Sequence, residues 1–233
     1  MHRKRACRAA ESMSIKRPVP KTLIAPQQPA PRIVAIGVST GGPAALANII
    51  PCFPRDFALP VLIVQHMPPL FARLLCDRLR HRSKLAIREA VHGEIIEPGR
   101  ILLAPGDFHM KVAGGPLTGK ILLDQSPPQN SCRPAVDALF LSLAEVFGGS
   151  VIAAVLTGMG RDGLLGAAAL KARGAHILAQ DEATSAVWGM PRAIVEAELA
   201  DAVLPLDKIV PQILSRSPGK HRPVLDEAHA WRR

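Results

Sequence analysis

The pattern of apolar and polar positions predicts an α/β protein in which strands and helices alternate. Short aliphatic runs bounded by turn residues are typical of strands in a parallel sheet. Such runs occupy residues 33–38, 61–64, 151–156, 175–179 and 202–204. Segments of helical composition or periodicity lie between and after them, at residues 43–50, 70–79, 134–147, 164–173, 190–199 and 208–214. This alternation is typical of β-α-β units, whose strands run parallel.

Residues 84–124 have a different pattern. Four strand-like pieces, at 85–91, 101–104, 109–112 and 120–124, are separated by turns rich in Gly and Pro. Short connections of this kind favour hairpins, so we expect an inserted β-hairpin region between the β-α-β units. The predicted fold class is therefore a doubly wound, mostly parallel sheet with flanking helices, a three-layer α/β/α protein.

The composition favours a protein of the cytoplasm. Of the 233 residues, 48% are apolar but only 3% are aromatic, which indicates an aliphatic core. The four cysteines (Cys7, Cys52, Cys76 and Cys132) form no C-x-x-C pair, as expected for incidental, reduced thiols. No apolar run is long enough to span a membrane, and the basic N-terminus lacks the apolar segment of a secretory signal. We therefore expect a cytoplasmic protein without membrane insertion.

The net charge of +10 is concentrated at the two ends of the chain. Residues 1–31 contain seven Lys or Arg and one acid, and residues 215–233 contain five against two acids. The region between them is close to neutral, so the net charge does not indicate a basic, nucleic-acid-binding surface on the folded domain. We predict disordered basic tails at 1–30 and 215–233 around one domain at 31–214. The tails either bind anionic partners or stay solvated.

The first predicted strand leads into a turn with the spacing of a nucleophile elbow. Gly37, Ser39 and Gly41 match G-x-S-x-G, and Pro43 suits the first turn of the helix that follows. Glycines permit a sharp turn, and the free N–H groups of a helix N-terminus favour a developing oxyanion. Plain strand-to-helix turns and phosphate-binding loops have the same pattern, so the motif alone does not define a function.

Three predicted strands end in polar turns that contain Ser39, His66 and Asp162. Because the carboxyl ends of parallel strands lie at one edge of a sheet, we expect these side chains to be neighbours. A serine hydroxyl needs a base to take its proton, histidine titrates in the right range, and a buried carboxylate orients the imidazole. The three residues predict a nucleophilic triad, in a chain order that differs from the Ser, Asp, His order of the α/β-hydrolases.

Six motifs resemble the catalytic domain of the chemotaxis protein-glutamate methylesterases, the CheB family, over roughly residues 31–210. The motifs are Ser39-Thr40-Gly41-Gly42, Gln65-His66-Met67-Pro68-Pro69, residues 104–110, Arg133-Pro134-Ala135-Val136-Asp137, residues 156–163 and residues 180–191. The resemblance implies a triad of Ser39, His66 and Asp162, with the backbone N–H groups of Thr40 and Met159 as the oxyanion hole. It also implies hydrolysis of glutamate γ-methyl esters on the cytoplasmic helices of methyl-accepting chemotaxis receptors, and deamidation of certain receptor glutamines.

Two features depart from the usual pattern of that family. Its members usually carry an N-terminal receiver domain with a phosphorylatable aspartate, whereas a basic segment precedes the first predicted strand here. We therefore expect no phosphorylation control within the chain, unless the chain is a fragment of a longer protein. In addition, Asn130-Ser131-Cys132 stands before Arg133 where relatives often have a histidine, which affects the expected substrate contacts and not the triad.

Other polar residues have both a functional and a structural interpretation. His109 either has a second catalytic role or fixes a loop, and we favour the loop. Asp107 and Asp137 are candidates for binding a metal, but the chain lacks a compact cluster of ligands. Structural hydrogen bonding is therefore favoured, and no metal or cofactor is expected. Arg133 either contacts receptor acids or pairs with Asp137, and Trp188 either lines the substrate cleft or covers the sheet edge.

Two other functional classes share part of this sequence pattern. One is a catalytically inactive module of the same fold that docks on receptors, or on nucleic acid through its basic tails. The complete set of Ser39, His66 and Asp162 argues against it. The other is a nucleotide-binding protein that uses residues 37–42, but this turn lacks G-x-G-x-x-G and a Walker lysine.

Overall fold

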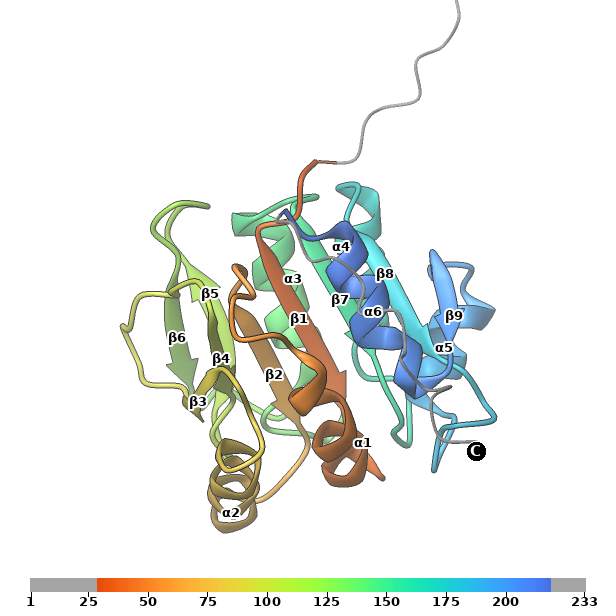
Figure 1. The fold of residues 1–233 in the computed structure, drawn as a ribbon, viewed down its shortest axis with the longest axis horizontal. Coiled ribbons are helices and arrows are strands. Elements are labelled where there is room, and N and C mark those ends of the chain that lie inside the picture. The colour runs from red at the N-terminus through yellow and green to blue at the C-terminus, as the bar shows by residue number, and fades with distance from the viewer. Residues whose placement is uncertain (1–28, 219–233) are drawn as a thin grey trace, which may run out of the picture.

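A computed structural model of the chain describes residues 29–218. Its centre is a sheet of seven parallel strands in the order β3-β4-β2-β1-β7-β8-β9 (Figure 1). The strands are β1 (Ile33–Val38), β2 (Val61–Gln65), β3 (Ala86–Glu89), β4 (Arg100–Leu103), β7 (Val151–Val155), β8 (His176–Gln180) and β9 (Ala202–Leu204).

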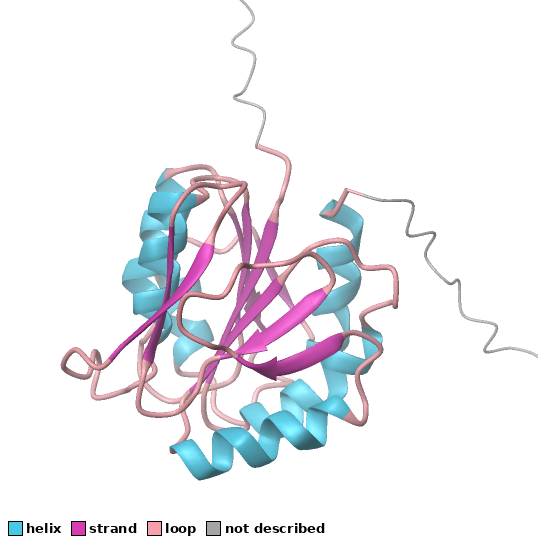
Figure 2. Cartoon of the chain, turned by 90° about the vertical axis from the view of Figure 1, so that its left-hand side faces the viewer, coloured by secondary structure: helices cyan, strands magenta, loops and turns pink. Residues whose placement is uncertain are grey.

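Helices cover both faces of this sheet, as Figure 2 shows. One face packs against α1 (Gly42–Ile49), α2 (Pro69–Arg80) and α6 (Leu206–Arg216), and a short 3-10 helix at Ile50–Cys52 follows α1. The other face packs against α3 (Val136–Val146), α4 (Leu164–Ala172) and α5 (Met190–Glu196). The predicted three-layer α/β/α arrangement is thereby confirmed.

The two apolar cores follow from the alternation of side chains along each strand. In β1, Ile33 and Ala35 face the core beneath α3 and α4, while Val34 and Ile36 face the core beneath α1 and α6. All four are fully buried. A strand buried on both faces needs an unbroken apolar run, which is the signal that residues 33–38 carry. Burial of each large aliphatic side chain contributes roughly 1.5–3 kcal/mol to stability.

The prediction of hairpins throughout residues 84–124 is wrong for its first half. β3 and β4 pair parallel with each other, and β4 pairs parallel with β2, so both belong to the main sheet. Only β5 (His109–Ala113) and β6 (Lys120–Asp124) form an antiparallel hairpin. The reason lies in β4, where Ile101 and Leu103 fill one core and Leu102 fills the other. A strand buried on both faces belongs inside a sheet rather than in an exposed hairpin.

Residues 1–28 and 219–233, and with them most of the two predicted basic tails, lie outside the described residues. The last helix, α6, ends at Arg216 and so continues two residues into the predicted C-terminal tail. Within residues 29–218, no helix has both the length and the apolar character needed to cross a membrane.

The topology places three loops at one edge of the sheet. β1 lies between β2 and β7, and the chains that leave β1 and β7 continue into helices on opposite faces. This reversal forms a crevice at the carboxyl ends of the strands, the usual position of a site in such sheets. The loops after β1, β2 and β7 lie at the lower edge in Figure 1.

We predict that Gly37→Ala destabilises the domain. A Cβ at this position in β1 would lie 2.4 Å from Cγ1 of Val136 in α3, so the strand or the helix must shift. Overpacking of this kind costs about 1–3 kcal/mol. Urea denaturation should therefore show a lower midpoint than for the wild type. In the control Gly115→Ala, the nearest atom, Oγ1 of Thr118, would lie 3.5 Å away, and the midpoint should not change. Equal midpoints for both variants would contradict the prediction.

Candidate active site

Ser39 lies at the end of β1 in a tight turn that leads into α1. The N–H of Gly42 donates to the Ser39 carbonyl over 2.8 Å, and the Ser39 N–H donates to the carbonyl of Thr157 after β7 over 3.0 Å. Gly41 has φ +81°, and a Cβ there would lie 2.5 Å from Cβ of Ala186. Glycine is therefore required both for the backbone conformation and for the close approach of the neighbouring loop.

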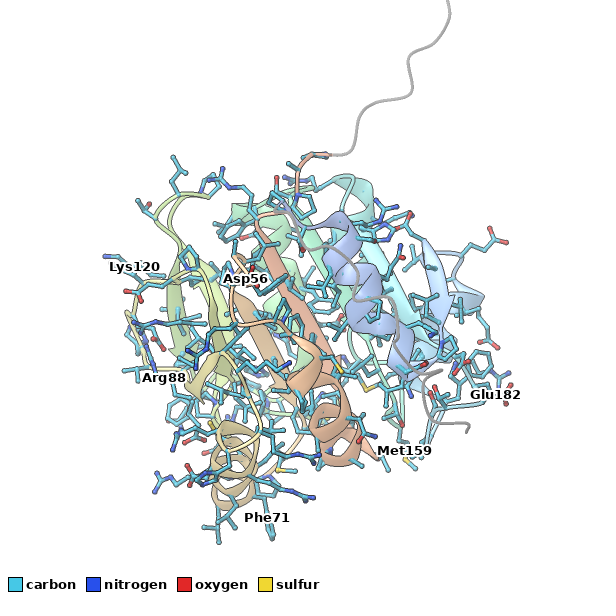
Figure 3. The ribbon with its side chains drawn as sticks, in the orientation of Figure 1. Asp56, Phe71, Arg88, Lys120, Met159 and Glu182 are labelled. Carbon is cyan, nitrogen blue, oxygen red and sulfur yellow. The ribbon has the colours of Figure 1, made fainter. Side chains whose placement is uncertain are left out.

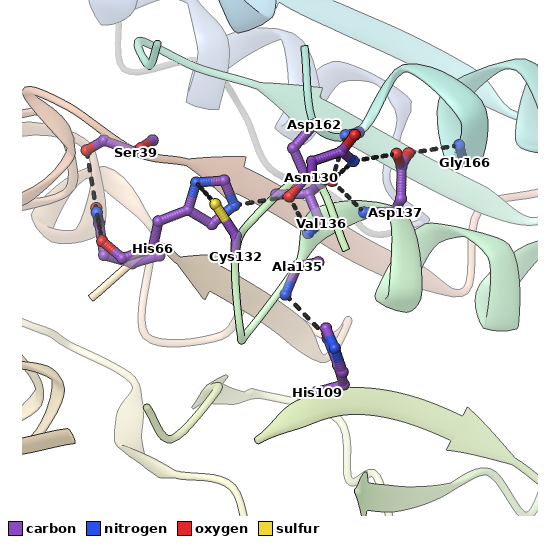
Figure 4. Close-up of polar contacts among 12 residues, drawn as sticks. Ser39, His66, His109, Asn130, Cys132, Ala135, Val136, Asp137, Asp162 and Gly166 are labelled. Atoms are coloured by element: carbon purple, nitrogen blue, oxygen red, sulfur yellow. Dashed lines mark hydrogen bonds and ion pairs between the residues drawn. The ribbon is translucent and has the colours of Figure 1, made fainter. Parts of the chain in front are cut away.

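His66 follows β2 directly and forms an ion pair with Asp162, which follows β7. The distance from Nε2 of His66 to Oδ2 of Asp162 is 2.7 Å, and the two side chains are 10% and 2% exposed (Figure 4). The structure thus brings the predicted base and carboxylate into contact, although they are far apart in the sequence. Because Asp162 binds Nε2, Nδ1 is the ring nitrogen that remains for another partner.

The Asp162 carboxylate lies at the N-terminus of α3. It accepts hydrogen bonds from the N–H groups of Val136 (2.6 Å) and Asp137 (3.1 Å), and from Gly163 (3.0 Å). Burial raises the pKa of Asp162, but the hydrogen bond from His66 and the backbone N–H groups outweigh burial and lower it. Asp162 is therefore a carboxylate at neutral pH, and it satisfies helix N–H groups that would otherwise lack acceptors.

Helices α3 and α4 exchange their caps at this point. Asp137, in the first turn of α3, accepts the N–H of Gly166 in α4 over 2.8 Å, while Asp162, just before α4, caps α3. The amide of Asn130 donates to both carboxylates, over 2.9 Å each (Figure 4). Burial raises the pKa of Asp137, against the hydrogen bond from Gly166. This exchange explains why Asp137 is buried and supports its structural interpretation.

The backbone N–H groups of Thr40 and Met159, the two positions expected for an oxyanion hole, make no hydrogen bond to another residue within 29–218. Thr40 follows Ser39 in the chain, and Met159 follows Gly158, which packs against Ser39. The backbone of Gly158 is bonded to residues 187–190, which fixes the segment just before Met159. Both groups are therefore available to a ligand at the edge where Ser39 and His66 lie.

The family model described as CheB methylesterase matches residues 34–213. The chain belongs to the CheB methylesterase family.

Curated relatives and a solved structure agree with this assignment. A "Protein-glutamate methylesterase/protein-glutamine glutaminase" of Maricaulis maris is 51% identical over 189 residues, which are 81% of this chain and 47% of the relative. A "Protein-glutamate methylesterase/protein-glutamine glutaminase 2" of Caulobacter vibrioides is 52% identical over 220 residues, which are 91% of this chain and 62% of the relative. This CheB family member spans about half the length of the curated relatives it matches.

The CheB methylesterase catalytic domain of Thermotoga maritima, known from a crystal structure, has the same fold. The match covers 79% of this chain and 98% of that domain, with a TM-score of 0.77 and 43% sequence identity. The described part of this CheB family member therefore corresponds to a catalytic domain.

His66 of this CheB family member has a second partner. Nδ1 of His66 lies 3.5 Å from Sγ of Cys132, and the Ser39 hydroxyl has no hydrogen-bond partner within residues 29–218. Burial lowers the pKa of His66, but the hydrogen bonds with Asp162 and Cys132 outweigh burial and raise it to about 9. The resting imidazole is therefore protonated at neutral pH.

Several residues that hold this CheB site together were missed by the sequence analysis. Gln65 donates from Nε2 to the carbonyls of Ser39 (3.0 Å) and His66 (3.1 Å), which ties the ends of β1 and β2. Thr157 donates its hydroxyl to the Thr40 carbonyl over 2.9 Å, which ties β7 to β1. The one sequence signal that indicates Gln65 and Thr157 is their position at the ends of predicted strands.

The other candidate residues have mainly structural contacts. Arg133 pairs with Asp107, with Nη2 and Oδ1 2.6 Å apart, and not with Asp137, which was one of the two interpretations left open by the sequence. His109 is buried, accepts the N–H of Ala135 and contacts the Pro127 carbonyl, which confirms its loop-fixing interpretation. Trp188 donates its indole N–H to the carbonyl at the end of β8, over 3.0 Å.

A depression of about 520 Å³ opens beside His66. Its lining residues come from the loops after β2, β4 and β6 and are His66, Met67, Pro68, Pro69, Asp107, Ser131, Cys132 and Arg133. Among the described residues, no group of three or more His, Cys, Asp or Glu is arranged to hold a metal ion. The depression lies next to His66, at the sheet edge where Ser39 also lies.

We predict that Asn130→Ala weakens both the fold and the site. Two buried carboxylates lose the amide that they share, and a buried acceptor left without its donor costs about 1–3 kcal/mol. Urea denaturation should show a lower midpoint, and ester hydrolysis should slow because Asp162 is held less firmly. Asn130→Asp should be worse, since it replaces a donor with a third carboxylate. Asn48→Ala, at an exposed position of α1, is the control and should resemble the wild type. An Asn130→Ala variant with wild-type stability would contradict the prediction.

Proposed function

We propose that the domain hydrolyses glutamate γ-methyl esters with Ser39 as nucleophile, His66 as base and Asp162 as the carboxylate that orients the base. The observation that carries this proposal is the His66–Asp162 ion pair at the sheet edge where Ser39 also lies. The family assignment supports it, since curated relatives are named protein-glutamate methylesterases.

The chemistry follows from Nδ1, the ring nitrogen of His66 that Asp162 does not bind. Nδ1 of His66 accepts the proton of the Ser39 hydroxyl while Oγ attacks the ester carbonyl carbon. The N–H groups of Thr40 and Met159 donate to the oxyanion that forms. His66 then gives the proton to the departing methoxide, methanol leaves, and water hydrolyses the acyl-enzyme by the same route. With a glutamine side chain the leaving group is ammonia, which gives a glutaminase activity.

We further propose that the substrate lies on the cytoplasmic helices of methyl-accepting chemotaxis receptors, so that the domain works in the cytoplasm. Leu70, Phe71 and Leu74 of α2 are 66%, 56% and 55% exposed, and α2 begins at the depression beside His66. Figure 3 shows Phe71 and Met159 pointing outward at the same edge of the molecule. Exposed apolar side chains beside a site are suited to the apolar face of a helical protein substrate.

The alternative is a catalytically inactive module that docks on the same receptors. The complete set of Ser39, His66 and Asp162 favours the enzyme. Release of methanol from membranes that contain methylated receptors separates the two, because only the enzyme releases methanol. Binding to these membranes without methanol release would overturn the proposed esterase function.

We predict that Ser39→Ala abolishes ester hydrolysis without unfolding the domain. Loss of the nucleophile leaves only oxyanion stabilisation and substrate binding, so the rate should fall by a factor on the order of 10⁴ or more. Asp162→Asn should be milder than His66→Ala, because asparagine still binds the imidazole. Ser131→Ala, beside the depression but outside the triad, is a matched control that keeps the rate within a few-fold. Methanol release measures all four variants, and near-wild-type activity of Ser39→Ala would contradict the triad.

We predict that hydrolysis of a small neutral methyl ester rises with pH. A protonated His66 cannot accept the serine proton, and its pKa is raised to about 9. The base form therefore appears as pH increases, and kcat/KM should approach its half-maximal value at about pH 9. A pH series of initial rates measures this dependence. A plateau that is already reached at neutral pH would contradict it.

A further inference from the structure

The nitrogen that must receive the serine proton is already in contact with a thiol. Sγ of Cys132 lies 3.5 Å from Nδ1 of His66, within hydrogen-bond range for sulfur, as Figure 4 shows. The Ser39 hydroxyl, in contrast, has no partner among the described residues. Ser39 and Cys132 both lie in loops at the sheet edge where His66 lies, and the proposed mechanism requires Nδ1 of His66 to take the proton of Ser39. Nδ1 has a single site for a hydrogen bond in the plane of the ring, so the two groups cannot use it at the same time.

The thiol is held in place by the turn that carries it. Gln129 and Cys132 exchange backbone hydrogen bonds of 2.8 and 3.1 Å, and Asn130 and Ser131 have φ of +49° and +62°. Asn130 hydrogen-bonds to Asp162 and so fixes this turn. Arg133, the residue after Cys132, pairs with Asp107. The sulfur that contacts His66 therefore belongs to a segment, residues 129–133, that is held by hydrogen bonds and also contacts the carboxylate of Asp162.

We propose that Cys132 is a positioning residue of the esterase: its thiol binds Nδ1 of His66 in the resting site and competes there with the Ser39 hydroxyl. The proposal rests on the proposed function. In the resting site the proton on Nδ1 of His66 is donated to the sulfur in a hydrogen bond, and no covalent bond is made or broken. The reactive site forms when this proton has passed to solvent and the thiol has left Nδ1, whose lone pair then takes the proton of Ser39.

Cys132 affects the pKa of His66 separately from the charged groups around the ring. Asp162 faces Nε2, and Asp137 lies behind it, joined through Asn130. Asp107 lines the same depression but is paired with the adjacent arginine. Burial lowers the pKa of His66, and the hydrogen bonds and charges of Asp162 and Cys132 raise it. Removal of the sulfur leaves Asp162 in place and should lower the pKa of His66 only in part.

The test compares pH profiles of kcat/KM on a small neutral methyl ester for the wild type, Cys132→Ala and Cys132→Ser. In Cys132→Ala the midpoint should move to lower pH by about half a unit or more, so that kcat/KM at neutral pH rises about threefold. Cys132→Ser keeps a hydrogen-bonding group without sulfur and should give an intermediate midpoint. Cys52→Ala removes an exposed thiol from the 3-10 helix at Ile50–Cys52. It is the matched control, and its pH profile of kcat/KM should equal that of the wild type.

An NMR titration of the His66 ring in the same proteins makes the test independent of turnover. A lower midpoint in Cys132→Ala than in the wild type supports the proposal in both measurements. An unchanged or higher midpoint, or a loss of activity at every pH in a folded Cys132→Ala protein, overturns it. If the wild type hydrolyses no ester, the proposed function fails, while the NMR midpoints still report whether Cys132 binds Nδ1. Cys132→Ser provides the comparison if the alanine variant does not fold.

Discussion

The site depends on the carboxylate of Asp162. A buried charge is costly unless donors surround it, and here the donors are the first turn of α3, the amide of Asn130 and the imidazole of His66. One side chain therefore caps a helix and holds the imidazole of His66. As a consequence, the packing of α3 against the sheet determines the positions of Asp162 and His66, although α3 supplies neither residue.

The exchange of caps between α3 and α4 makes this arrangement rigid. Asp137 of α3 binds the N-terminal turn of α4, and Asp162, next to α4, binds the N-terminal turn of α3. Gln65 and Thr157 brace the turn of Ser39 from the two neighbouring strands. Reacting groups must be held within a fraction of an ångström for efficient transfer, and these cross-connections provide that constraint.

The contacts that raise the pKa of His66 stabilise the fold but keep the imidazole protonated. The pKa of His66 in the folded domain is raised to about 9, above its ordinary value of 6.5. Its interaction with Asp162 therefore stabilises the fold fully below about pH 6.5, and this contribution is lost as the pH rises through about 9. The unprotonated imidazole that the proposed mechanism needs forms in the pH range where His66 contributes least to folding. Active sites often show this opposition between stability and function.

The sequence by itself determined the parallel strands β1, β2 and β7, because aliphatic runs buried on both faces are recognisable over five or six residues. It also determined Ser39, His66 and Asp162 as candidates, because strand ends and family motifs are local features. Only the tertiary structure decided that β3 and β4 join the main sheet, that Arg133 pairs with Asp107, and that Asn130 and Cys132 contact the triad. The physical reason is that these contacts join segments distant in the chain. Their partners are selected by packing and by the need to satisfy buried charges, which no local pattern encodes.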